Sequence, residues 1–241
     1  MIFIRGMLFF IFIVLSVFCH SQINYGTIIY ERKTNLYKKF KGWDDVRYWI
    51  KESDKSKVEF FVLYFDDSLS CFKPQDSNLK DQTDWTTSKN TVYQNFKTQR
   101  RLSIKEIWGE KLYVEDSMLI RKWKITDNKR NICSYSCRKA IWEVNDSMRI
   151  YAWYCDDIRI NTGPESFYGL PGAILGLATE DGGVIYFAKT IELLKPKQEL
   201  LLPQKTKKKI YTTPELRAKL EKDFGKEKWG KALLHEAFDV W

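Results

Sequence analysis

The sequence is poor in the residues on which many catalytic and metal sites depend. It holds only two histidines among 241 residues, His20 and His235. A serine or cysteine nucleophile that is activated by histidine needs that histidine as a close neighbour, and no motif of the chain indicates such a pair. Cys133 and Cys137 have neither zinc-finger spacing nor a second pair of ligands. The sequence therefore predicts no catalytic residues, no metal site and no cofactor, and it favours a protein that is not an enzyme.

Long hydrophobic runs are scarce as well, because the only one lies at the N-terminus. Met7–Phe18 is a short apolar segment that follows the positive charge of Arg5 and precedes small or polar residues. This layout is typical of a secretory signal peptide rather than of a membrane span. We predict a signal peptide over residues 1–21, an exported mature chain over residues 22–241, and no transmembrane span in that mature chain.

No internal repeat or low-complexity segment divides the chain, so we predict a single β-rich domain over residues 22–241. Apolar residues make up 44% of the sequence and aromatic residues 15%, a composition that supports a sizeable core and wide sheets. Short strand candidates follow one another with turn residues and no helices between them, which indicates an antiparallel sheet. We predict a mainly β fold in which about ten strands form a curved sheet, an open barrel or bowl, with a C-terminal helical segment. The expected strands are Gly26–Glu31, Lys57–Phe65, Ser68–Phe72, Thr91–Phe96, Arg101–Ile107, Lys111–Glu115, Leu119–Ile125, Asn131–Val144, Met148–Asp156, Ala173–Thr179 and Val184–Glu192.

One hairpin has a register that its side chains specify. A loop at Asn145–Ser147 places complementary residues opposite each other. The pairs are Val144 with Met148, Glu143 with Arg149, Ile141 with Tyr151, Lys139 with Trp153, and Cys137 with Cys155. Opposed cysteines at a non-hydrogen-bonded position come close enough to bridge, and an exported chain meets oxidising conditions. We therefore predict a Cys137–Cys155 disulfide, while Cys133 either pairs with Cys71 or stays free.

The chain is basic, with a formal net charge of +9. Much of the excess lies in residues 195–209, which we interpret as a basic linker. Such a segment either makes peripheral contact with an anionic membrane surface or is a solvated loop. Nucleic acid is not a predicted partner, because no matching motif is present. Thr213 as N-cap and Pro214 in the first turn then predict a helix, so that residues 195–241 form a basic linker and a helical appendage.

The stretch Thr162–Leu175 combines glycine and proline with large apolar side chains, and we call it the glycine–proline loop. It lacks the features of a phosphate-binding loop, because its prolines remove amide donors and no Lys–Ser/Thr pair or helix follows. We interpret it as a rigid structural turn, in which proline fixes φ and glycine allows positive φ or close backbone approach. The residues that define it are Gly163, Pro164, Phe167, Gly169, Leu170, Pro171 and Gly172.

Gly169–Leu175 reads GLPGAIL. At this run and at several others the chain resembles the GLPGLI family of exported proteins, with Ala173 in place of the usual leucine. The further matches are Gly26–Glu31, Trp123–Ile125, Cys137–Ala140, Trp153–Cys155, Gly163–Pro164 and Phe167. Within Trp153–Cys155, Cys155 stands where the family has threonine. The resemblance implies export to the periplasm or the outer membrane, and it brings no established activity and no catalytic residues.

Two functions remain open at this point. The first is an exported, non-enzymatic binding or accessory protein of the cell envelope that holds a lipid or another hydrophobic ligand, or docks an envelope protein. The second is a hydrolase of glycans or peptides that uses Asp156, Asp157 or Glu165 near the glycine–proline loop, since paired carboxylates serve acid–base chemistry. Carboxylates next to a turn are more often caps or solvated groups, and the sequence favours the binding protein.

Overall fold

The computed structural model describes residues 24–43, 47–75, 83–107 and 109–227, together with residues 230, 234, 237 and 238. The predicted signal peptide lies outside these residues. The strands are β1 (Gly26–Asn35), β2 (Ser56–Phe65), β3 (Leu69–Pro74), β4 (Thr91–Asn95), β5 (Arg100–Ile107), β6 (Glu110–Ser117), β7 (Lys124–Ile132), β8 (Tyr135–Asn145), β9 (Met148–Cys155), β10 (Ala173–Thr179), β11 (Val184–Glu192) and β12 (Ile210–Tyr211). The α-helices are α2 (Leu36–Lys39), α4 (Gln198–Leu201) and α5 (Thr213–Phe224), and short 3₁₀ turns lie at Glu52–Asp54 and Asp84–Thr86.

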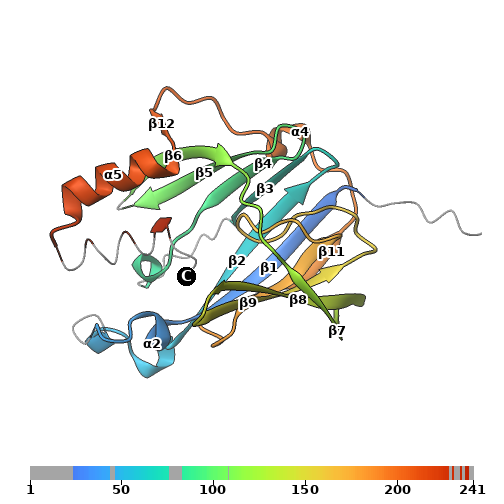
Figure 1. Cartoon of the computed structure of the whole chain (residues 1–241), viewed down its shortest axis with the longest axis horizontal. Helices are drawn as coiled ribbons and strands as arrows, with labels where there is room; N and C mark the ends of the chain where they lie inside the picture. Colours follow the sequence, from blue (N-terminus) through green and yellow to red (C-terminus); the bar gives the residue numbers. More distant parts are fainter. Residues whose placement is uncertain are drawn as a thin grey trace, which may run out of the picture.

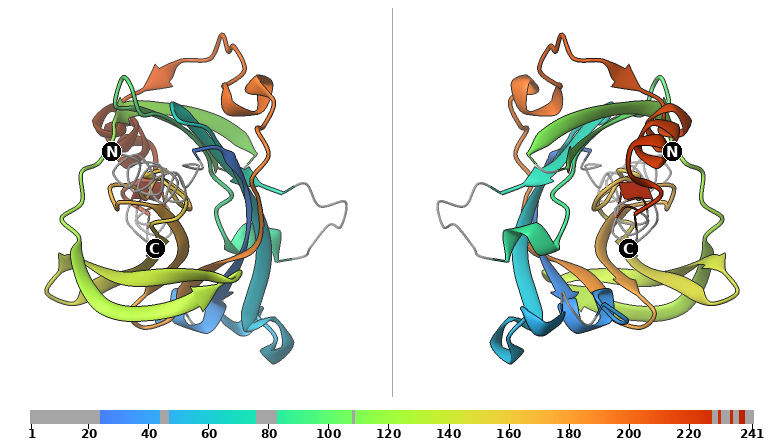
Figure 2. Two further views of the ribbon diagram at one scale, coloured as in Figure 1. Left: turned by 90° about the vertical axis from the view of Figure 1, so that its right-hand side faces the viewer. Right: turned by 90° about the vertical axis from the view of Figure 1, so that its left-hand side faces the viewer.

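All twelve strands belong to one sheet, in the order β12-β6-β5-β4-β3-β2-β1-β11-β10-β9-β8-β7 (Figure 1). Neighbouring strands are antiparallel, apart from the short β12, which runs parallel to β6. The sheet curves strongly, so that its two arms face each other in the end-on views of Figure 2. The predicted curved antiparallel sheet is thus confirmed, and it stays open rather than closing into a barrel.

Alternation along the strands gives the sheet two different faces. On β1, Ile28, Tyr30 and Arg32 are buried between less buried neighbours, and we call the face that carries them the inner face. The main apolar core lies on this face. Its largest fully buried members are Tyr30, Tyr154, Tyr186, Phe61, Phe65 and Phe72. Phe61 and Phe72 stack with ring centroids 5.1 Å apart, so aromatic rings from β2 and β3 pack directly against β1 and β11.

The glycine–proline loop connects β9 to β10 and packs into this core through Phe167 and Leu170. The Tyr30 hydroxyl donates a hydrogen bond of 2.7 Å to the carbonyl oxygen of Ile174. Two glycines meet different requirements: Gly169 has φ +97°, and a Cβ on Gly172 would lie 2.0 Å from the carbonyl oxygen of Cys155. The end of the loop therefore lies against the end of β9 at a distance that only glycine permits.

The C-terminal segment forms a second, smaller core. Leu216 and Leu220 of α5 pack against Leu112 and Val114 of β6. The helix begins one residue earlier than predicted, because Thr212 rather than Thr213 is the N-cap and forms a capping box with Glu215. Residues 195–209 are likewise not a plain linker, since they include α4 and lead into β12. No helix in the described ranges is both long enough and apolar enough to cross a membrane.

Two of the predicted strands differ from the structure. Residues 118–123 are not a strand, and the predicted Asn131–Val144 strand is interrupted by a tight turn at Cys133 and Ser134. Both turn residues have positive φ, 49° and 68°. The sequence gives no warning of this turn, because neither residue is the glycine that such a conformation favours.

The hairpin of β8 and β9 has the predicted register in its middle, where Glu143 pairs with Arg149 and Lys139 with Trp153. At the turn, Asn145 rather than Val144 pairs with Met148. The predicted Cys137–Cys155 disulfide is not present, and the four described cysteines are free thiols. Cys137 Sγ lies 3.5 Å from the carbonyl oxygen of Tyr135, and Cys155 Sγ lies 3.7 Å from Asp157 Oδ2. A hydrogen bond between the two thiols raises the pKa of Cys137 and lowers that of Cys155.

The contact at Gly172 leads to a stability prediction. Gly172→Ala should lower the free energy of unfolding by about 3 kcal/mol or more, because its methyl group would overlap the Cys155 carbonyl oxygen and force the backbones apart. Urea unfolding followed by tryptophan fluorescence measures the loss. Gly183→Ala is the matched control, since its Cβ would meet only the side chain of Asp181. Equal midpoints for the two variants would contradict this account of the loop.

Candidate functional site

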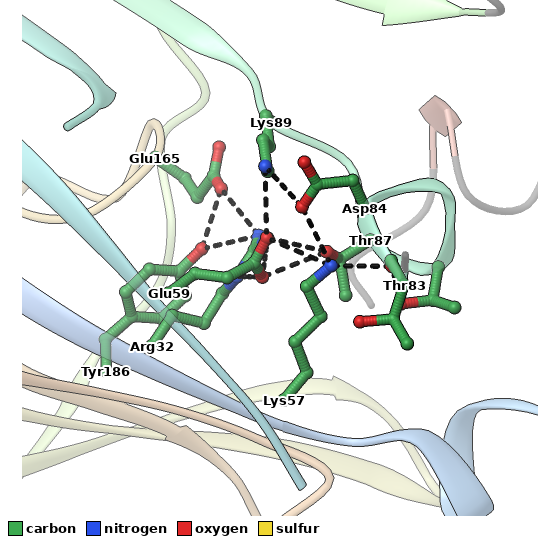
Figure 3. A network of polar contacts seen from close by, with 10 residues as sticks. Arg32, Lys57, Glu59, Thr83, Asp84, Thr87, Lys89, Glu165 and Tyr186 are labelled. Atoms are coloured by element: carbon green, nitrogen blue, oxygen red, sulfur yellow. Dashed lines mark hydrogen bonds and ion pairs between the residues drawn. The ribbon is translucent and has the colours of Figure 1, made fainter. Parts of the chain in front are cut away.

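A cluster of charged side chains centred on Arg32 of β1 lies on the inner face amid its apolar core (Figure 3). Arg32 is 4% exposed. Its guanidinium donates to Glu59 Oε2 of β2 at 2.6 Å and 3.1 Å, and to the hydroxyl of Tyr186 of β11 at 3.2 Å. The same group lies 4.5 Å from the ring centroid of Phe61. Burial alone would lower the pKa of Arg32, but the neighbouring Tyr186, Glu59 and Glu165 raise it above its ordinary value.

The strand pairing explains why charges gather here. Each of these side chains occupies an inward position, since Arg32 pairs with Glu59 across β1 and β2 and with Tyr186 across β1 and β11. β3 pairs only with Phe61–Phe65 of β2. Among the described residues, the first half of β2 therefore has no neighbouring strand on that side, and residues 83–90 approach it there (Figure 3).

Residues 83–90 supply partners for the remaining charges. Thr87 Oγ1 donates to Glu59 at 2.9 Å. Lys57 Nζ donates to the carbonyl oxygen of Thr83 at 2.6 Å and to Asp84 Oδ1 at 3.2 Å. Lys89 Nζ binds the same Asp84 oxygen at 2.9 Å. Partial burial opposes ionisation of Asp84, but the hydrogen bonds from Lys89 and Lys57 hold its pKa below the ordinary value.

The glycine–proline loop adds a second carboxylate, that of Glu165. Its Oε1 accepts a 2.8 Å hydrogen bond from the Tyr186 hydroxyl and lies 3.9 Å from Arg32. Glu165 has φ +55°, an unfavourable conformation for a residue with a Cβ. Burial raises the pKa of Glu165, although Arg32 and Tyr186 act in the opposite direction. Strain and burial together mark Glu165 as a residue that the surrounding contacts hold in place.

Asp84 and Lys89 also line a groove of about 430 Å³. Its other lining residues lie mainly on the face opposite the core, which we call the outer face, and on the segment that follows α4. They are Lys73, Pro74, Gln75, Thr91, Tyr93, Ile104, Glu106, Lys111, Tyr113 and Gln204. The buried network of Arg32 and the groove thus share two residues, and the network fixes the position of both.

The residues predicted as candidates lie in different places. Asp156 and Asp157 are exposed in the turn after β9, whereas Glu165 is buried beside Arg32. The hydrolase hypothesis needs two of these carboxylates at one cleft, and the structure divides them between an exposed turn and the core. Within the described ranges, no cluster of three or more histidine, cysteine, aspartate or glutamate side chains is arranged to hold a metal ion.

The sequence analysis missed Arg32, Lys57 and Glu59. A signal was available, because all three fall on the inward parity of strands whose other inward residues are Tyr30 and Phe61. Burying a charged side chain among apolar ones destabilises the fold unless the charge has partners. Such residues are for that reason candidates for a site. Their partners in residues 83–90 follow from the tertiary structure alone.

Comparison with known proteins gives a family match over part of the chain and a structural match over most of it. A family described as "Protein of unknown function (Porph_ging)" matches residues 141–176, from β8 through the glycine–proline loop into β10. That description does not confirm the GLPGLI name. No curated protein matches the chain.

Solved structures of similar fold include PNGF-II in two crystal forms. The C2 form has a TM-score of 0.55 at 16% identity, and the P21 form a TM-score of 0.56 at 13% identity. In each case the match covers 81% of this chain but 32% of PNGF-II. The chain therefore spans about a third of the length of these structures, and at this identity the likeness shows the fold alone.

The raised pKa of Glu165 predicts a specific dependence of stability on pH. A carboxyl group whose pKa is higher in the folded state contributes stability below its unfolded pKa of about 4.3, and this contribution is lost as pH rises through the folded pKa. The free energy of unfolding of Glu165→Gln, relative to that of the parent, should therefore increase from pH 4 to pH 8. The increase is ~1.4 kcal/mol for each tenfold difference between the proton affinities of Glu165 in the folded and the unfolded state. Urea unfolding at intervals across this range measures it.

Glu180→Gln is the control variant, because its stability relative to the parent should change with pH in the opposite direction. Hydrogen bonding to Tyr151 and Arg149 lowers the pKa of Glu180, so the parent gains stability over this variant as pH rises. Parallel pH curves for Glu165→Gln and the parent would contradict the assignment of Glu165 as a destabilised buried carboxylate.

Proposed function

We propose that this protein is an exported, non-enzymatic binding protein of the cell envelope, and that the groove on its outer face holds an acidic carbohydrate. The observation that carries the proposal is the lining of the groove, in which lysines, tyrosines and amides surround a space of about 430 Å³. Export rests on the N-terminal segment of the sequence and on the resemblance described above.

The charges of the groove favour an acidic ligand. Lys73, Lys89 and Lys111 face two carboxylates, Asp84 and Glu106. Asp84 is already neutralised, because Lys57 and Lys89 both bind it. The positive charge that remains suits a carboxylate or phosphate substituent on the ligand.

The other lining residues suit a sugar. Tyr93 and Tyr113 present aromatic rings, and Gln75 and Gln204 offer amides that both donate and accept hydrogen bonds. Pyranose rings carry hydroxyls around their edge and apolar C–H faces, so they need this mixture of polar groups and aromatic surface. A purely apolar ligand would leave the lysines and amides of the groove without partners.

The inner face is a weaker candidate for ligand binding. Its apolar side chains pack against each other and against Phe167 and Leu170 of the glycine–proline loop. A lipid on that face would have to displace packed aromatic side chains, each of which contributes several kcal/mol when buried. We therefore prefer a polar ligand at the groove to the hydrophobic ligand that the sequence suggested.

Binding of uronic-acid oligosaccharides, with neutral oligosaccharides of equal length as references, tests the proposal by isothermal titration calorimetry. The acidic ligands should bind at least about tenfold more tightly, corresponding to ~1.4 kcal/mol for one charge-assisted hydrogen bond. Lys111→Gln and Tyr113→Ala should each weaken binding by about that factor. Lys129→Gln, which alters an exposed lysine of β7 outside the groove, should have no effect. Absence of binding, or equal loss in all three variants, would refute the proposal.

A further inference from the structure

Two arginines from separate parts of the chain meet at the tip of the glycine–proline loop. Arg101 of β5 donates to Ser166 Oγ at 3.2 Å. Arg121, between β6 and β7, donates to the same oxygen at 3.4 Å and to the carbonyl oxygen of Ser166 at 2.9 Å. The two guanidinium groups are thus held around one hydroxyl group, although they repel each other.

Aromatic rings fix Arg121 in this place. Its guanidinium lies 4.1 Å from the ring centroid of Phe167 and 5.0 Å from that of Trp142. Arg121 is only 8% exposed. Stacking on two rings orients the planar group and shields it from water, so an anion that reached it would bind in a medium of low polarity.

The negative charge nearby does not balance the pair. Asp116 lies 3.7 Å from Arg101, and it is also the acceptor for the hydroxyl of Thr213 at the start of α5, at 2.6 Å. Among the described residues, Arg121 forms no ion pair. The buried charge of Arg121 and the partly buried charge of Arg101 therefore share one partly engaged carboxylate.

Several polar atoms around the pair have no hydrogen-bond partner among the described residues. They are Nε of Arg101, Nε of Arg121, the hydroxyl of Tyr168 and the amide nitrogen of Gln94. Gln94 pairs with Arg101 across β4 and β5. Burial raises the pKa of Tyr168, while the nearby Arg121 and Arg101 act to lower it, so its hydroxyl keeps its proton and lies within reach of both arginines' charge. Each of these atoms can donate a hydrogen bond, and unsatisfied buried donors are rare in folded proteins.

We propose that Arg101, Arg121 and Tyr168 form a binding site for an oxyanion, the phosphate or carboxylate group of a small ligand. Two oxygens of such a group can accept parallel hydrogen bonds from one guanidinium fork, and its charge would balance the two arginines. The site is distinct from the groove, since Arg101 and its partner Gln94 lie on the inner parity of their strands. Access is through Arg101, whose side chain is 18% exposed.

The pKa shifts of Arg101 and Arg121 agree with this geometry. Burial, and then the proximity of Arg101, lowers the pKa of Arg121 to about 10. Burial also lowers the pKa of Arg101. A bound anion would reverse both effects, because an opposite charge at short range favours the charged form of each group.

Titration of the full mature protein with sodium phosphate and with sodium acetate, each matched in ionic strength by sodium chloride, tests the proposal. The melting temperature should rise with either oxyanion and saturate, since a ligand that binds only the folded state stabilises it by mass action. Chloride at equal ionic strength should give a smaller, non-saturating change. A response to phosphate alone would assign the site to phosphate groups, and a response to both would extend it to carboxylates.

Tyr168→Phe is the decisive variant, because it removes one unpartnered hydroxyl and leaves the ring in place. It should weaken oxyanion binding about tenfold, and Arg121→Gln should abolish it. The control is Arg100→Gln, which alters the neighbouring, exposed arginine that pairs with Glu115. If Arg121→Gln does not fold, the oxyanion affinities of Tyr168→Phe and Arg100→Gln still test the proposal. A response equal to that of chloride, or equal affinities for Tyr168→Phe and Arg100→Gln, would overturn the proposal.

Discussion

The buried guanidinium of Arg32 is the constraint on which much of this structure depends. A charge that is 4% exposed is tolerated only if its donors are satisfied and its charge is balanced. Glu59, Tyr186 and Glu165 meet that need from β2, β11 and the glycine–proline loop. Residues 83–90 then complete the set by binding Glu59 and Lys57 beside the free half of β2. The central strands, one loop and one connecting segment are therefore linked through a single side chain.

This link relates the two faces of the sheet. On the outer side, Asp84 and Lys89 carry the network into the groove, where their positions define part of the lining. On the inner side, Glu165 adjoins Ser166, which holds Arg101 and Arg121. The glycine–proline loop thus has polar roles at its tip and apolar roles at Phe167 and Leu170. An interpretation of the loop as purely structural captures the second role and misses the first.

Local patterns in the sequence predicted local structure well. The strands Ala173–Thr179 and Val184–Glu192 and the middle register of the β8–β9 hairpin agree with the structure, because nearby residues and their alternation determine them. Prediction failed at the turn of Cys133 and Ser134, where tertiary contacts override the preference for glycine. The disulfide prediction was wrong for a different reason: the register in the middle of the hairpin was right and the two thiols lie close enough to hydrogen-bond, but they are not bonded through sulfur. The inward parity of Arg32, Lys57 and Glu59 marks them as single candidates, but their assembly into one network could not be predicted, because its members are far apart in sequence, from residue 32 to residue 186.

The most direct test of this account is a double-mutant cycle between Arg32 and Glu59, with Arg32→Met and Glu59→Gln, read as free energies of unfolding in urea. If Arg32 balances Glu59 within the core, each single variant removes the closest partner of a buried charge and loses about 3–5 kcal/mol. The double variant should then lose at least ~2 kcal/mol less than the sum of the two. Losses that add to within ~0.5 kcal/mol would show that the two residues do not depend on each other, and would contradict the central role of Arg32.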